Sequence, residues 1–154
     1  MVVPTSTTTR SAAAVGTRVA LGVLGAAGLV AAAFLDWTDD IQGLDLRWNA
    51  LYKTVFVTTD TAYKSIGGLS IVLGLLLVVS LLTRLGSLTG LIALLGIAMF
   101  VLFVIEIYRD SVSHDIQIGA WVALGGSVLG LIGALVPTRR KAPVATGVDT
   151  TAVP

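Results

Sequence analysis

Four uncharged apolar stretches constrain this chain more than any other feature of its sequence. They cover residues 19–35, 66–82, 88–105 and 116–136, and each is long enough to cross a bilayer, which takes about 17–25 mostly apolar residues. None of them alternates apolar and polar residues as a membrane β-barrel does, and helices satisfy their own backbone polar groups in lipid. The stretches predict an all-α, polytopic membrane protein with a bundle of four transmembrane helices.

The composition agrees with a membrane location. Of the 154 residues, 55% are hydrophobic and only 12% are charged, whereas soluble domains have about 45–50% apolar and about 25% charged residues. This leaves too little polar surface for a water-soluble body, and a net charge of +1 gives no field that would attract a polyanion. A soluble enzyme, a disordered regulator and a nucleic-acid binder are disfavoured, and the first expected partner is the lipid bilayer.

The basic residues predict the orientation of the four helices. Six lie on one side of the predicted membrane: Arg10, Arg18, Arg84, Arg139, Arg140 and Lys141. Four lie on the other side: Arg47, Lys53, Lys64 and Arg109. Because cytoplasmic segments are enriched in Lys and Arg, both termini are expected in the cytoplasm and the loop 36–65 outside.

The first apolar stretch has a second interpretation. Arg10 and Arg18 precede an Ala/Gly-rich segment ending in Ala31-Ala32-Ala33, which also matches a signal peptide with a small-residue cleavage site. The stretch is longer than the apolar region of most signal peptides, so an uncleaved first helix is favoured. Residues 1–17 and 138–154 show no apolar periodicity and are expected to be disordered cytoplasmic tails, the second of them basic.

The loop 36–65 is the only sizeable segment outside the predicted membrane domain 18–137. Four of its apolar residues share one face of a helix: Leu44, Trp48, Leu51 and Val55. This spacing predicts a short amphipathic helix lying in the membrane interface. All three tryptophans fall near the same water boundary and are expected to anchor the chain there: Trp37, Trp48 and Trp121.

Most of the 17 glycines lie within the predicted spans. Small residues allow membrane helices to approach closely, and several here have the matching spacing of three or four. The expected helix-packing residues are Gly22, Gly25, Gly28, Ser70, Gly74, Gly126 and Gly130. The pattern predicts tight packing, either within one chain or between copies.

Few polar residues of the chain could take part in catalysis or bind a metal or cofactor. The chain has no cysteine and one histidine, so disulfides, thiolate clusters and histidine-ligated haem or zinc are disfavoured and no cofactor is expected. One group could form a polar or cation site on the outer face: Glu106, Asp110, His114 and Asp115. A solvated acidic loop is the favoured interpretation. Glu106 is expected to pair with Arg109 or Lys64, with a coupling site of a transporter as the alternative.

Two segments are similar to segments of a known group of proteins. Phe34-Leu35-Asp36-Trp37 ends the first span, and residues 118–126 read Ile-Gly-Ala-Trp-Val-Ala-Leu-Gly-Gly. Over most of 18–137 the chain resembles small four-helix integral membrane proteins of high-GC Gram-positive bacteria, which implies a bacterial plasma membrane but no activity.

Without a catalytic motif, the leading prediction is a non-enzymatic accessory or scaffold subunit of a membrane assembly. It would bind another membrane protein or a second copy of itself. The alternatives are an oligomeric pore or small transporter, including a phage-type lysis or exclusion protein.

Overall fold

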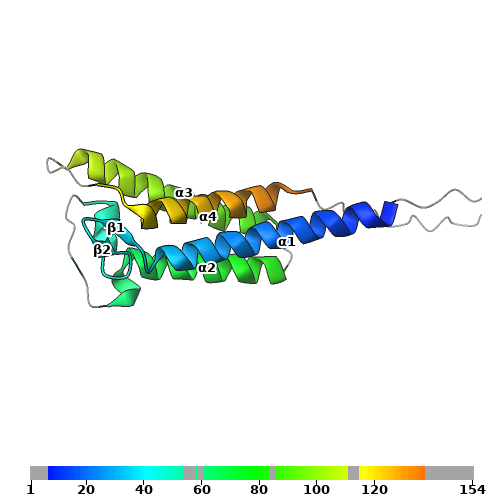
Figure 1. Ribbon diagram of the computed structural model, residues 1–154, viewed down its shortest axis with the longest axis horizontal. Coiled ribbons are helices and arrows are strands. Elements are labelled where there is room, and N and C mark those ends of the chain that lie inside the picture. The colour runs from blue at the N-terminus through cyan, green and yellow to red at the C-terminus, as the bar shows by residue number, and fades with distance from the viewer. Residues whose placement is uncertain (1–6, 54–57, 59–60, 84–85, 111–114, 138–154) are drawn as a thin grey trace, which may run out of the picture.

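The computed structural model describes residues 7–53, 58, 61–83, 86–110 and 115–137. Its four helices are α1 (Thr7–Ala32), α2 (Ile66–Leu82), α3 (Gly86–Arg109) and α4 (Ile118–Leu135). They lie along one long axis, and each runs antiparallel to the next (Figure 1). We call the end where α1 begins and α4 ends the terminal end, and the opposite end the loop end.

The loop end carries four short elements between α1 and α2. They are strands β1 (Asp36–Thr38) and β2 (Ile41–Gln42), followed by 3₁₀ turns η1 (Trp48–Leu51) and η2 (Ala62–Lys64). The strands form an antiparallel hairpin. Its two-residue turn holds Asp39 and Asp40 at φ of 43° and 61°, a backbone region that Asp tolerates better than most side chains and that matches the twist of a hairpin.

The prediction of four helices is confirmed, and three of them are long and apolar enough to cross a membrane: Ala13–Ala32, Gly86–Arg109 and Ile118–Leu135. Helix α2 occupies the predicted stretch 66–82 without a shift at either end. It carries no charged residue and is strongly apolar, but its 17 residues make it about 26 Å long.

The expectation of a disordered tail over residues 1–17 is wrong for residues 7–17, because α1 already begins at Thr7. The sequence Ser-Ala-Ala-Ala-Val at 11–15 explains this early start, since alanine is the strongest helix former. Residues 1–6 and the predicted basic tail 138–154 lie outside the described residues.

Helix α1 also ends at Ala32, before the predicted limit of 35. The chain turns there because the hairpin supplies new backbone partners. Leu44 N–H donates to the Ala33 carbonyl at 2.9 Å, and Gly43 N–H donates to the Leu35 carbonyl at 3.0 Å.

The predicted amphipathic helix in the loop is wrong. Of its expected face, Leu51 is buried, Trp48 is half exposed, and Val55 lies outside the described residues. Backbone pairing with distant segments replaces the helix, as Ile66 N–H donates to the Leu46 carbonyl at 2.8 Å. Among the described residues from 44 to 53, only the single turn η1 is helical.

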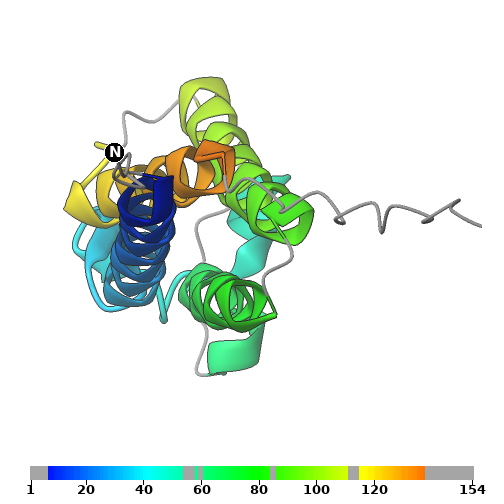
Figure 2. The same ribbon diagram turned by 90° about the vertical axis from the view of Figure 1, so that its right-hand side faces the viewer.

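The helices form a ring in which α1 contacts α2 and α4, and α3 contacts the same two neighbours. Viewed from the terminal end, α1 and α4 lie side by side (Figure 2). Fully buried side chains fill the interior, among them Leu29, Leu77 and Phe103. The bundle is therefore packed with apolar side chains along its axis.

Helices α1 and α4 meet backbone to backbone. A Cβ atom at Gly25 would lie 2.6 Å from the carbonyl oxygen of Gly126, and one at Gly28 would lie 3.1 Å from the Gly126 Cα. We call Gly25, Gly28 and Gly126 the glycine seam. Any side chain at these positions would force the two helices apart.

Two adjacent glycines of α4 allow a matched test. A Cβ atom at Gly126 would lie 2.7 Å from the Gly25 carbonyl oxygen, whereas one at Gly125 would meet nothing within 4 Å. We expect Gly126→Ala to lower the free energy of unfolding by about 1–3 kcal/mol through overpacking. Gly125→Ala should be neutral or slightly stabilising, because alanine is the better helix former. Denaturant titration in detergent, followed by circular dichroism, measures both, and equal effects would contradict the seam.

Candidate functional site

The centre of the loop end is the buried side chain of Trp37, which has no exposed surface. Its indole Nε1–H donates to the carbonyl of Ala32 at 2.7 Å. Its ring meets Phe103 of α3 edge-on, with centroids 5.2 Å apart and an interplanar angle of 77°. The last turn of α1 is thus connected to α3 through one side chain.

Two glycines make room for this ring. A Cβ atom at Gly43 would lie 2.7 Å from Trp37 Nε1, and one at Gly119 would lie 2.6 Å from Trp37 Cδ1. The backbone of β1 is held as well, because Gln117 N–H donates to the Trp37 carbonyl at 3.0 Å. We call Trp37, Gly43, Phe103 and Gly119 the Trp37 cluster.

The prediction that Trp37 anchors the chain at the water boundary is therefore wrong. The indole N–H has an internal acceptor at Ala32 and needs no headgroup or water. Trp48 and Trp121 are each 51% exposed, and their anchoring role stays a prediction. Trp121 also packs on Phe100, with ring centroids 5.3 Å apart.

The loop also caps the start of α2. Gly67 N–H donates to the Gly43 carbonyl at 2.6 Å, and Gly68 N–H donates to the Ser65 hydroxyl at 2.9 Å. These bonds satisfy donors that a helix N-terminus leaves unpaired. A Cβ atom at Gly67 would lie 2.6 Å from the Leu44 nitrogen, so only glycine permits this approach.

The structure places each residue of the expected helix-packing set at a contact between helices of the same chain. Beyond the glycine seam, Gly22 faces the Leu81 side chain. A Cβ atom at Gly130 would lie 2.7 Å from Leu77 Cδ1, and one at Gly74 would lie 3.0 Å from the Ala26 carbonyl oxygen. Ser70 lies 4.0 Å from Met99 Sδ. These surfaces are used within the chain.

The expected polar site at the loop end is only partly assembled. The Glu106 side chain is 7% exposed, and its Oε1 lies 3.2 Å from Arg109 Nη1 in a salt bridge. Arg109, rather than Lys64, is thus the partner of this carboxylate. His114 lies outside the described residues, and among the residues described no group of three or more His, Asp or Glu could hold a metal ion.

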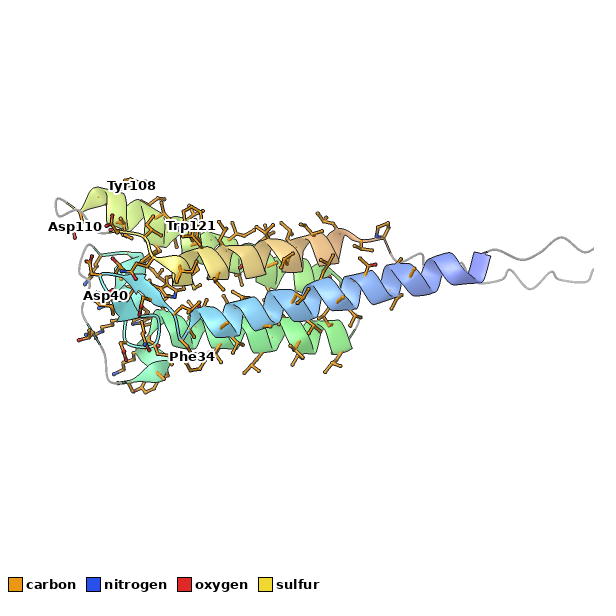
Figure 3. The ribbon with its side chains drawn as sticks, in the orientation of Figure 1. Phe34, Asp40, Tyr108, Asp110 and Trp121 are labelled. Carbon is orange, nitrogen blue, oxygen red and sulfur yellow. The ribbon has the colours of Figure 1, made fainter. Side chains whose placement is uncertain are left out.

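Asp110 and Asp40 both lie at the loop end but come from different segments (Figure 3). Asp40 Oδ1 accepts a hydrogen bond from Gln117 Nε2 at 3.4 Å, which connects the hairpin turn to the start of α4. Asp115 is exposed to solvent. The acidic residues are thus spread over the hairpin, the end of α3 and the segment before α4.

Hydroxyl groups inside the bundle are bonded within the chain. Ser80 Oγ and Thr89 Oγ1 lie 3.0 Å apart and link α2 to α3 near the terminal end. Ser70 donates to the Ile66 carbonyl at 3.1 Å, and Ser127 donates to the Ala123 carbonyl at 2.9 Å. Only the Ser80–Thr89 contact among these joins two helices, whereas Ser70 and Ser127 are satisfied by their own helices.

The residues that sequence reasoning missed are Gly43, Gly67 and Gly119. A glycine pair at 67–68, at the start of the apolar stretch 66–82, is the one signal in the sequence, since it can mark a close backbone approach. Gly43 and Gly119 gave none, because each is explained only by the tryptophan ring against it.

Comparison of the chain with known protein families, with characterised proteins and with solved structures gives no match.

The Trp37 cluster predicts that replacing tryptophan by phenylalanine affects stability more at Trp37 than at Trp121. Trp37→Phe removes the donor to the Ala32 carbonyl and should lower the free energy of unfolding by about 1–2 kcal/mol. Trp121→Phe at a half-exposed position should change it by less than about 0.5 kcal/mol. Unfolding of both variants in detergent, monitored by far-ultraviolet circular dichroism, tests this difference. An equal loss in the two variants would argue against a structural role for the buried indole.

Proposed function

We propose that this chain is a non-enzymatic integral membrane protein, an accessory or scaffold subunit of an assembly in a bacterial plasma membrane. The observation that carries the proposal is its packing. Backbone contact at the glycine seam closes the bundle, while large apolar side chains cover its outside. Such a body offers helix faces to lipid or to other membrane helices.

Exposed apolar side chains occur on every helix. Leu24 of α1 is 58% exposed, Leu75 of α2 is 57%, Leu94 of α3 is 53% and Ile132 of α4 is 47%. In water this surface would be costly, whereas in a bilayer it is the natural exterior. The glycines of the helix-packing set lie in contacts within the chain, so a partner helix would pack mainly on leucine- and valine-rich faces.

We further propose that α2 is a fourth membrane span and that both termini are cytoplasmic. Helix α2 packs along α1 and α3, and its first N–H groups are capped by Ser65 and the loop. Its length of about 26 Å is close to the hydrocarbon thickness of about 30 Å, a difference that bilayers accommodate by thinning.

A scaffold is supported over a transporter by the polar groups of the bundle. Glu106, the one carboxylate within the described parts of the four helices, is paired with Arg109 at the loop end. The buried hydroxyls of Ser70, Ser80 and Ser127 bond to carbonyls of their own helices. A polar route would need groups that are free to exchange partners with a solute.

Cysteine labelling tests the topology, because the chain has no cysteine of its own that would be labelled beside an introduced one. Tyr63 is 77% exposed in the loop, and Ser87 is exposed at the start of α3. We expect a membrane-impermeant maleimide to label Tyr63→Cys in intact cells and Ser87→Cys only after permeabilisation. Equal labelling of both variants in intact cells would show that α2 does not cross.

Photo-crosslinking in native membranes tests the scaffold role. A photoreactive residue at exposed Leu94 or Ile132 should capture one defined membrane protein or a second copy of the chain. The same residue at fully buried Leu77 serves as the control and should capture neither. Solute flux into proteoliposomes that is abolished by Glu106→Gln would instead identify a transporter and overturn the proposal.

A further inference from the structure

One sequence motif is not explained by the proposed scaffold, the run Ala31-Ala32-Ala33 around the end of α1. Its first and third residues have the small side chains that mark a signal-peptidase site, with the cleaved bond between Ala33 and Phe34. The apolar region between Arg18 and the end of the motif is residues 19–33, as long as the longest of the roughly 7–15-residue regions of signal peptides. The motif therefore meets the sequence requirements of a processing site.

In the folded chain, both sides of the Ala33–Phe34 bond are held by hydrogen bonds. The Ala33 carbonyl accepts from the Leu44 N–H at 2.9 Å, and the Phe34 N–H donates to the Ala31 carbonyl at 3.0 Å. The carbonyl that a peptidase would attack is thus tied to the segment after the hairpin. The nitrogen that would leave is tied to the last turn of α1.

A peptidase needs a different arrangement of the motif. A protein that binds an extended segment pairs with its main chain and holds alternate side chains in pockets, and the alternate residues here are Ala31 and Ala33. Ala31 is exposed, but Ala33 has no exposed surface. The Ala32 carbonyl between them accepts from Trp37 Nε1–H at 2.7 Å. The motif can therefore be bound only after these bonds have opened and the end of α1 has unwound.

The donors that close the motif come from the residues that directly follow it. Trp37 and Leu44 lie within 13 residues of Ala31, and Gly43 N–H adds a bond to the Leu35 carbonyl at 3.0 Å. Contacts between residues close in sequence form early in folding. These bonds can therefore form before the later helices have been synthesised, and closure does not wait for the glycine seam.

We propose that the Ala33–Phe34 bond is a signal-peptidase site that the folded loop end keeps closed, so that only chains with an unformed loop end are cleaved. Hydrolysis adds one water across this amide, leaves a carboxylate on Ala33 and an amine on Phe34, and separates α1 from the other helices. The remaining chain lacks Gly25 and Gly28 of the glycine seam. The inference rests on the proposed topology, because signal peptidases cleave on the side of the membrane away from the cytoplasm.

Expression of the full chain with a C-terminal tag in bacterial cells tests the site, with mass spectrometry to identify a fragment that begins at Phe34. The wild-type chain should remain almost entirely at full length. Trp37→Ala removes the donor to Ala32, and Gly43→Val adds a Cβ atom 2.7 Å from Trp37 Nε1 and 3.1 Å from the Ala33 carbonyl oxygen. Each variant should give about tenfold more fragment, because losing one hydrogen bond raises the open population by about that factor.

Two controls separate this site from general proteolysis. Trp121→Ala, at a half-exposed position of α4, should leave the wild-type ratio unchanged. Adding Ala31→Phe to Trp37→Ala puts a large side chain where the enzyme accepts a small one, so the fragment should disappear.

Three results would overturn the inference: a wild-type chain that is processed, a fragment that persists in the double variant, or Trp37→Ala and Gly43→Val chains that both stay at full length. The labelling of Tyr63→Cys in intact cells reads the topology separately, so a failure of the cleavage site can be told apart from a failure of the proposed topology.

Discussion

Contact between the backbones of α1 and α4 is the constraint on which the rest of the structure depends. Lipid chains are as apolar as leucine, so membrane helices gain stability from close packing and from hydrogen bonds between them. Gly25 and Gly126 supply that packing by removing every side-chain atom from the contact. The seam also brings the end of α1 beside the start of α4, which lets the Trp37 ring lie against Gly119.

At the loop end, the segment between α1 and α2 forms a cap over the helices. Carbonyls of Gly43 and Leu46 accept hydrogen bonds from the first residues of α2, and the Trp37 ring contacts Phe103 of α3. One short segment therefore touches the ends of all four helices. The cap fixes the helices relative to each other more firmly than lipid-facing leucines could, because hydrogen bonds and ring contacts have direction.

The helices could be predicted from the sequence because long apolar runs have few alternatives in lipid, and α2 matches its predicted range. The pairing of Glu106 with Arg109 could also be predicted, since residues three apart share a helix face. The structure of the loop could not be predicted from the sequence. The spacing of apolar residues that suggested a helix through Leu44 and Trp48 carries no information about Ile66. The Ile66 N–H donates a hydrogen bond to the Leu46 carbonyl and so fixes the loop in another form. The burial of Trp37 likewise depends on Gly119, which is close only in the folded chain.

The glycine seam also sets an order on biosynthesis, because it joins the first helix of the chain to the last. Helices α1, α2 and α3 emerge from the ribosome before α4 exists, so Gly25 and Gly28 face lipid or an insertion factor during that interval. Contacts between residues far apart in sequence form late, and incompletely assembled surfaces are where misassembly occurs. The contact between α1 and α4 is thus complete only when the last helix of the chain has been synthesised.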